Sequence, residues 1–180
     1  MTDASIVTSA LRYAAEIYDG IYRPGSSRAP FVTHLSETAE LVARAGGTPD
    51  EVAAAWLHDV VEDGHASLAT IREQFGSAIA ALVEAVTDPA DVGSLPIKER
   101  KTAQAARLAT ASDGAKRIKM GEQISILRAL AVERPASWSV ERCTDYVAGT
   151  RQVAAICGDV SAFLNDQFAT AHTAAEKAMP

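Results

Sequence analysis

The spacing of apolar residues is the feature that most constrains the fold of this chain. Apolar side chains recur with helical periodicity along almost the whole sequence, and alanine is abundant. No stretch shows the alternating period of two that marks a half-buried strand. The 180 residues are 48% hydrophobic and 22% charged, which suffices for one compact core and excludes a disordered chain. We therefore expect an all-α fold with one helical domain over residues 1–180.

Capping residues, prolines and glycines predict where the helices begin and end. Thr48 is a candidate N-cap, Pro49 occupies the first helical position and Glu51 completes a capping box. Pro24 and Gly25 follow the first helix and prevent it from continuing. The expected helices cover residues 4–21, 34–45, 51–61, 68–75, 77–86, 98–111, 114–132, 138–157 and 160–174, with a loop over 88–96 and a frayed end after Ala174.

Charge and composition exclude several classes of protein. A net charge of −6 argues against a general basic surface for nucleic acid. No apolar run reaches the ~20 residues that span a bilayer, and the first residues lack the apolar core of a secretory signal. Cys143 and Cys157 fit reduced packing residues better than a disulfide or a metal pair. These features predict a cytoplasmic protein with no nucleic-acid or membrane partner. The apolar positions of the last two helices fit either the core or the interface of a homodimer.

Four titratable residues close the apolar helix that starts at Thr48. His58 and Glu62 are four residues apart, as are Asp59 and Asp63, so each pair lies on one face if the helix continues. Burial of such groups is costly unless something compensates them. A divalent metal ion is one compensation, because imidazole and carboxylate ligands suit Mn, Fe, Zn or Mg.

One helical turn cannot complete a coordination shell, so a further ligand must come from elsewhere. His34 begins the preceding helix and is the best candidate, whereas His65 and His172 are expected on the surface. A lone His-Asp pair is by itself a weak signal, since a helix cap or a salt bridge also explains it. The upstream histidine and the following Glu-Asp pair favour the metal site.

The order and spacing of several blocks are far more specific than the His-Asp pair. Together they resemble the HD-domain phosphohydrolases, and among these the small alarmone hydrolases and the (p)ppGpp-hydrolase domain of the bifunctional Rel/SpoT enzymes. The resemblance is strongest over residues 10–155. Its blocks are Pro30–His34, Ala54–Asp63, Phe75-Gly76, Leu82–Asp88, Glu99–Lys101 and Gly114–Met120.

The resemblance implies one Mn²⁺ ion per chain, held by two histidines and two acidic residues, although another divalent metal fits the same ligand types. The implied ligands are His34, His58, Asp59 and, in the fourth place, Glu122. Glu62 and Asp63 match the pair that positions or activates the attacking water, since a carboxylate can take a proton from water. The implied reaction removes the 3′-pyrophosphate of (p)ppGpp, giving GDP or GTP and pyrophosphate.

The same resemblance implies a substrate-binding set. Arg23 matches an arginine used against the nucleotide base, and a guanidinium stacks well on a purine. Basic residues near two helix starts could steer a polyanionic nucleotide, although a solvated helix face explains them too. The full set is Arg23, Lys98, Arg100, Lys119, Ile126 and Tyr146, and Lys101 lies beside it on the same basic helix start.

The sequence departs from the family pattern where the fourth ligand is expected. Glu122 replaces an aspartate, Ile126 replaces an asparagine, and Gly121 adds flexibility. Ile126 cannot donate or accept a hydrogen bond, and a ligand displaced by ~1 Å can lose much of its activity. Two alternatives to (p)ppGpp hydrolysis therefore stay open. One is hydrolysis of another phosphorylated nucleotide, such as an adenosine alarmone, and the other is a degenerate, non-enzymatic nucleotide-binding protein.

Overall fold

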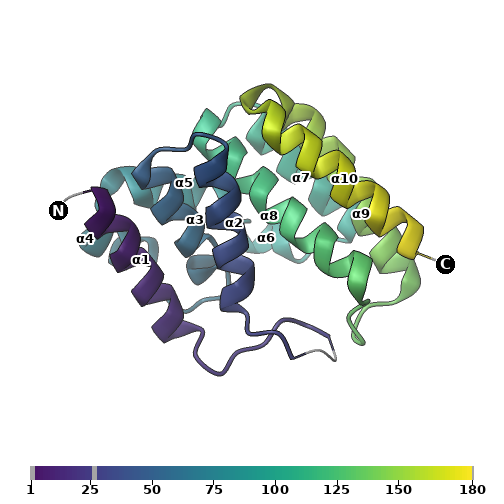
Figure 1. Ribbon diagram of the computed structural model, residues 1–180, viewed down its shortest axis with the longest axis horizontal. Helices are drawn as coiled ribbons and strands as arrows, with labels where there is room; N and C mark the ends of the chain where they lie inside the picture. Colours follow the sequence, from purple (N-terminus) through teal and green to yellow (C-terminus); the bar gives the residue numbers. More distant parts are fainter. Residues whose placement is uncertain (1–2, 26–27, 180) are drawn as a thin grey trace.

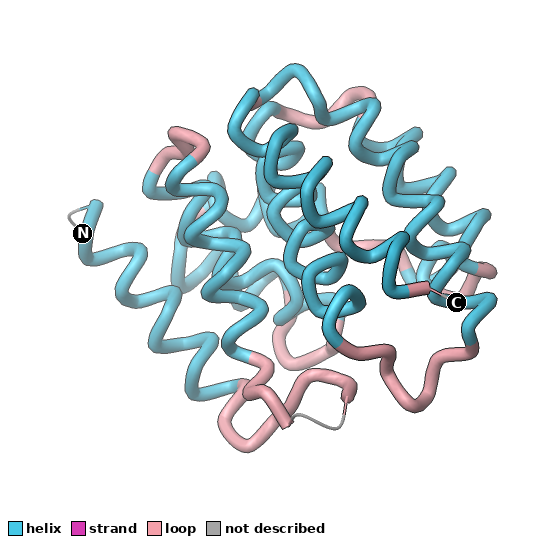
Figure 2. The backbone as a smooth tube through the Cα atoms, turned by 45° about the vertical axis from the view of Figure 1, so that its right-hand side comes forward, coloured by secondary structure: helices cyan, strands magenta, loops and turns pink. Residues whose placement is uncertain are grey.

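A computed structural model describes residues 3–25 and 28–179, and these residues are almost entirely helical (Figures 1 and 2). An isolated bridge between Tyr22 and Pro30 is the extended pairing found in the described part of the chain. The all-α prediction is therefore confirmed. The elements are α1 (Asp3–Ile17), α2 (Val32–Arg44), α3 (Pro49–Glu62), α4 (Leu68–Phe75), α5 (Ser77–Val86), α6 (Ala90–Gly93), α7 (Ile97–Leu108), α8 (Asp113–Val132), α9 (Val140–Cys157), the 3-10 turn η1 (Gly158–Val160) and α10 (Ala162–Ala178).

Side-chain caps explain several boundaries. The Thr48 hydroxyl accepts a hydrogen bond from the Glu51 amide at 3.3 Å, as the start signal predicts. Helix α9 begins two residues later than expected, because Ser139 and not a residue before Trp138 caps it. Helix α1 ends earlier than expected, and Gly20 follows it with a positive φ of 71°.

The end of the chain corrects two expectations. Helix α10 continues to Ala178, and Ala175 is fully buried, so the frayed end expected after Ala174 is a packed helical turn. His172 is buried as well, and its Nε2 lies 3.0 Å from the Val147 carbonyl oxygen. Its predicted surface position is wrong because α10 packs along α8 and α9. Cys143 and Cys157 are buried free thiols, in agreement with a packing role.

Two hydrophobic cores are joined by α8, which passes between them (Figure 1). Helices α1–α5 form the first core, and Ala115 and Ile118 from the start of α8 complete it. The later part of α8 packs with α9 and α10 in the second core through residues such as Met120, Ile124 and Leu127. A functional site at the junction of the cores can therefore draw side chains from α2, α3, α7, α8 and α9.

Gly121 allows the close approach of α2 and α8. A Cβ atom at this position would lie 3.2 Å from the Thr38 carbonyl oxygen and 3.3 Å from Thr38 Cγ2. Both distances are shorter than an ordinary van der Waals contact. The structure therefore gives Gly121 a packing role, where the sequence suggests only a flexible helix.

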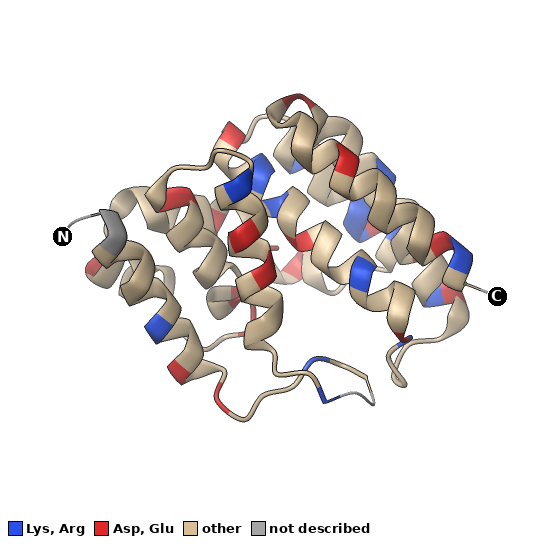
Figure 3. Ribbon diagram, viewed as in Figure 1, with Lys and Arg blue, Asp and Glu red and all other residues tan. Residues whose placement is uncertain are grey.

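Acidic and basic residues are interspersed along the helices (Figure 3). Among the described helices, none is long and apolar enough to cross a membrane.

We expect Thr48→Ala to lower the free energy of unfolding by about 1 kcal/mol, because the Glu51 amide loses its capping partner. Urea unfolding followed by circular dichroism measures the change. Thr48→Ser keeps the hydroxyl and should stay within a few tenths of a kcal/mol of the wild type. Equal destabilisation by both substitutions would show that the methyl group, and not the cap, matters.

Candidate metal centre and pocket

Three potential metal ligands converge near the start of α2 and the end of α3. His34 Nε2 lies 3.2 Å from His58 Nε2 and 3.5 Å from Asp59 Oδ2. His58 Nε2 lies 3.3 Å from the same carboxylate oxygen. The two histidines are buried and Asp59 is largely buried. Among the described residues, these three side chains form a group whose ligand atoms all lie within 4.8 Å of one another.

A hydrogen bond at Nδ1 orients the imidazole ring of each of the two histidines. His58 Nδ1 lies 2.7 Å from the Ala55 carbonyl oxygen, which can only accept, so this nitrogen carries the proton. His34 Nδ1 lies 2.9 Å from Ser125 Oγ. A proton on Nδ1 leaves the Nε2 lone pair free, and the Nε2 atoms of the two rings face each other.

The spacing and chemistry of these atoms fit a divalent metal ion. Two nitrogen or oxygen ligands at ~2.1 Å from one ion lie ~2.9–3.4 Å apart in octahedral or tetrahedral geometry. Burial lowers the pKa of His34 well below its usual value, which keeps the ring neutral and able to ligate. Burial also raises the pKa of Asp59 to about 7, although His58 opposes this shift. A bound cation would compensate the buried carboxylate.

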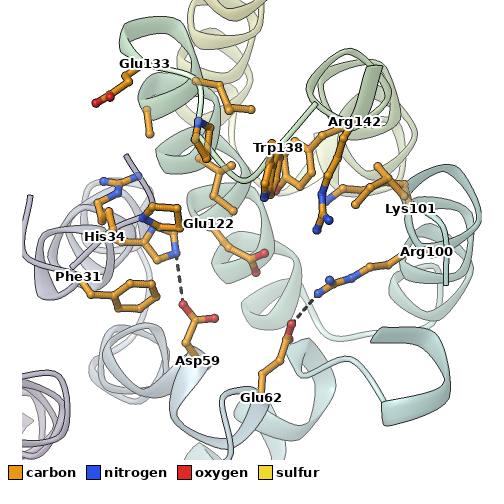
Figure 4. A pocket seen from close by; sticks show the side chains of 18 of the residues that line it. Phe31, His34, Asp59, Glu62, Arg100, Lys101, Glu122, Glu133, Trp138 and Arg142 are labelled. Carbon is orange, nitrogen blue, oxygen red and sulfur yellow. Dashed lines mark hydrogen bonds and ion pairs between the residues drawn. The ribbon is translucent and has the colours of Figure 1, made fainter. Parts of the chain in front are cut away.

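Glu122, the expected fourth ligand, has a different partner. Its Oε2 lies 2.6 Å from Lys119 Nζ, and its Oε1 accepts a hydrogen bond from Gln123 Nε2 at 3.2 Å. Burial alone would raise the pKa of Glu122, but Lys119, His58 and Lys101 together outweigh it, and the pKa falls to about 2. Figure 4 shows the carboxylate pointing into the space between Asp59 and Arg100, while its oxygens lie outside the compact three-residue group.

The two expected catalytic carboxylates have separate environments. Glu62 lies on the pocket wall, where Arg100 donates to Oε1 at 2.6 Å and the Asp88 amide donates to Oε2 at 3.1 Å (Figure 4). Asp63 lies just past the end of α3 and is exposed, and the Tyr18 hydroxyl donates to its Oδ2 at 2.8 Å. Burial and the nearby carboxylates raise the pKa of Tyr18 far above its usual value, so the hydroxyl remains a donor.

A cavity of about 230 Å³ opens beside the three-residue group. Of the expected substrate-binding residues, Arg23, Arg100, Ile126 and Tyr146 line it. Lys98 does not, because its side chain is 72% exposed and pairs with Asp145 at 3.0 Å. Lys119 is buried behind the cavity wall, where it pairs with Glu122.

The lining residues that the sequence-based set lacks include Lys101, Trp138 and Arg142. The Arg142 guanidinium lies 4.7 Å from the centre of the Trp138 ring, and the Trp138 and Tyr146 rings are 5.3 Å apart. This end of the cavity therefore offers an aromatic surface with a cation beside it. The signal for Lys101 was present in the sequence, since it falls on the helical stripe that contains Ala105 and Leu108, both buried.

Lys101 is a buried cation of the cavity wall. Its Nζ donates to Gln123 Oε1 at 2.7 Å and lies 4.1 Å from the centre of the Tyr146 ring. Gly149 makes room for it, because a Cβ atom there would lie 2.6 Å from Lys101 Cγ. Burial lowers the pKa of Lys101 to about 7.

This shift predicts a pH-dependent stability. In the window between about pH 7 and the ordinary lysine pKa of ~10.4, the unfolded chain holds a proton that the folded chain lacks. The free energy of unfolding therefore rises with pH in this window. Lys101→Met should remove this part of the slope. The variant should be more stable than the wild type by an amount on the order of a few kcal/mol near pH 7, and this difference should be smallest near pH 10.

Chemical denaturation near pH 7 and near pH 10 measures the difference. Lys98→Met is the matched control, because Lys98 is exposed on the same helix and its loss should leave the slope unchanged. Parallel pH curves for the wild type and Lys101→Met would contradict the expectation.

Comparisons with known proteins agree with this geometry. A family model described as an HD domain matches residues 10–147. The chain is 31% identical over 154 residues to guanosine-3′,5′-bis(diphosphate) 3′-pyrophosphohydrolase MESH1 of Xenopus tropicalis, covering 84% of each chain. It is 34% identical over 145 residues to the protein of the same name from Drosophila melanogaster, covering 79% of each chain.

Solved structures show the same relationship. A protein described as a metazoan ortholog of SpoT that hydrolyzes ppGpp superposes with a TM-score of 0.83 at 30% identity, over 92% of this chain and 93% of that one. A Listeria monocytogenes protein at 22% identity, with a TM-score of 0.65 over 81% of this chain and 98% of its own, shares the fold. The resemblance expected from the sequence blocks is thus confirmed, and the chain belongs to the HD-domain family.

Proposed function

We propose that this chain is a metal-dependent phosphohydrolase that removes the 3′-pyrophosphate of (p)ppGpp and releases GDP or GTP and pyrophosphate. The observation that carries the proposal is the convergence of His34, His58 and Asp59 on one point beside a cavity whose wall carries several arginine side chains. Relatives with high coverage bear the name of this activity.

His34, His58 and Asp59 would hold the metal, which we propose to be one Mn²⁺ ion per chain, with Glu122 as the candidate for a further ligand. When bound, a divalent ion supplies Lewis acidity at a phosphoryl oxygen and makes water a better nucleophile at neutral pH. The Nδ1 hydrogen bonds of the two histidines orient their Nε2 atoms toward each other and toward Asp59, where they would hold the ion.

Glu62 and Asp63 are the proposed proton acceptors for the attacking water. Glu62 already faces the cavity, and Arg100 and the Asp88 amide hold its carboxylate in place. Asp63 is held by the Tyr18 hydroxyl. The two carboxylates are thus oriented by separate partners, and Glu62 is the one placed to contact a molecule in the cavity.

The cavity wall supplies contacts for a nucleotide. Arg23 and Arg100 line the cavity and can pair with phosphate oxygens. Trp138 and Tyr146 also line it and offer aromatic surface to a base, with Arg142 beside Trp138. Lys98 and Lys119 would act at a distance, because neither lines the cavity.

A second candidate is hydrolysis of another phosphorylated nucleotide. Its support is the apolar part of the wall, where Ile97, Ile126 and Leu130 line the cavity without offering hydrogen bonds. A nucleotide with fewer hydrogen-bonding groups on the part that contacts this wall would suit it better than (p)ppGpp.

The test is pyrophosphate release from ppGpp by the purified chain with Mn²⁺ or with EDTA. We expect release that requires Mn²⁺ and falls at least ~100-fold in the double variant His58→Ala/Asp59→Ala, because two proposed ligands are lost. Circular dichroism and unfolding curves check that the variant is folded. Metal binding without ppGpp hydrolysis, together with turnover of an adenosine alarmone, would favour the second candidate.

We also expect Ile126→Asn to raise kcat/KM for ppGpp about fivefold, since one added hydrogen bond contributes about 1 kcal/mol. Steady-state kinetics on ppGpp measures the change. Ile126→Val keeps the wall apolar and should leave kcat/KM within twofold. A loss of activity in Ile126→Asn would indicate that the apolar wall contacts the substrate directly.

A further inference from the structure

Two polar residues that do not line the cavity, Ser125 and Glu37, are linked to the Nδ1 side of the His34 ring. Ser125 on α8 is fully buried, and its Oγ lies 2.9 Å from His34 Nδ1. The same hydroxyl donates to Glu37 Oε2 on α2 at 2.5 Å. Helices α2 and α8 lie side by side here, at the close approach that Gly121 allows (Figure 1).

The direction of these hydrogen bonds follows from the donors available. Arg128 donates to Glu37 Oε1 at 2.7 Å, and Arg23 lies 3.8 Å from Oε2, so Glu37 is a charge-paired carboxylate that accepts. Ser125 has one hydroxyl proton, and the 2.5 Å contact assigns it to Glu37. Ser125 Oγ must therefore accept from His34, which places the ring proton on Nδ1.

This assignment matters because the groups in front of the ring favour the opposite tautomer. A proton on His34 Nε2 could bond to His58 Nε2 at 3.2 Å or to Asp59 Oδ2 at 3.5 Å, both of which can accept. That tautomer would satisfy the protein without a metal but would block Nε2 as a ligand. The hydrogen bond between His34 Nδ1 and Ser125 Oγ opposes the Nε2–H tautomer.

We propose that Ser125 and Glu37 are a positioning pair that holds His34 in the tautomer whose Nε2 lone pair faces His58 and Asp59. The consequence for metal affinity rests on the metal role proposed above, but the tautomer itself does not. The pair also holds Arg23, whose Nη2 donates to the Ser125 carbonyl oxygen at 3.0 Å. One buried serine thus connects a proposed metal ligand with a proposed substrate-binding arginine.

The decisive test reads the tautomer directly in the EDTA-treated, metal-free protein. Two-bond ¹H–¹⁵N correlation spectra at mildly alkaline pH distinguish the Nδ1–H from the Nε2–H form of each of the four histidines. We expect His34 in the Nδ1–H form in the wild type. In Ser125→Ala the His34 proton should move largely to Nε2, because the remaining acceptors, His58 Nε2 and Asp59 Oδ2, lie on the Nε2 side of the ring. Glu37→Gln keeps an acceptor for the hydroxyl and should retain the Nδ1–H form.

Thr38→Val is the matched control. The Thr38 hydroxyl is buried one turn from His34 and donates to the backbone oxygen of that residue at 3.0 Å, not to its ring. Its loss should leave the tautomer unchanged. A wild-type His34 in the Nε2–H form, or a Ser125→Ala spectrum with His34 still in the Nδ1–H form, would overturn the proposal.

Calorimetric titration with Mn²⁺ alone provides the second readout. We expect Ser125→Ala to weaken Mn²⁺ binding ~10–100-fold, the usual effect of losing a partner behind a metal-bound histidine, and Thr38→Val to bind as the wild type does. Unchanged Mn²⁺ affinity in Ser125→Ala would overturn the link to the metal. If the wild type itself bound no Mn²⁺, the proposed function would fail, while the tautomer spectra would still decide the role of the pair.

Discussion

The close contact between α2 and α8 is the constraint on which the rest of the site depends. Gly121 leaves no side chain between the helices, and a Cβ atom there would meet Thr38. Because the helices approach so closely, α8 can bring Ser125 behind His34 and Glu122 in front of it. Helix α8 also completes the first core and begins the second, so the site is held by the same element that joins the two cores.

Buried charge is organised in small, nearly balanced sets around this junction. Asp88 is paired with Arg100 and hydrogen-bonded to Gln104, Glu122 is paired with Lys119, and Glu37 is paired with Arg128. Such pairs offset the desolvation of ionised groups. Asp59 differs, since the groups closest to its carboxylate are two imidazoles. That local deficit of positive charge is the physical reason why a cation belongs there.

The sequence predicts much of the fold because its boundary signals are local. Ser67 and Gly76 delimit α4, and Gly76 separates it from α5, so both ranges agree with the structure. The convergence of His34 with His58 is also predictable from the sequence blocks. Lys98 and Lys101 show where inference from family position alone fails, because the apolar stripe of α7, which contains Ala105 and Leu108, buries Lys101 and exposes Lys98. The contact of Glu37 with Ser125 joins residues 88 positions apart, and no local pattern encodes it.

The position of α8 in the chain has a consequence for how the protein is made. Synthesis proceeds from the N-terminus, so α1–α5 leave the ribosome before α8 does. The first core needs Ala115 and Ile118 from α8, so it stays open on one side until those residues emerge. Ser125 emerges later still, and His34 lacks its hydrogen bond at Nδ1 until then. The order of synthesis therefore leaves the orientation of the His34 ring incomplete until most of the chain has been translated.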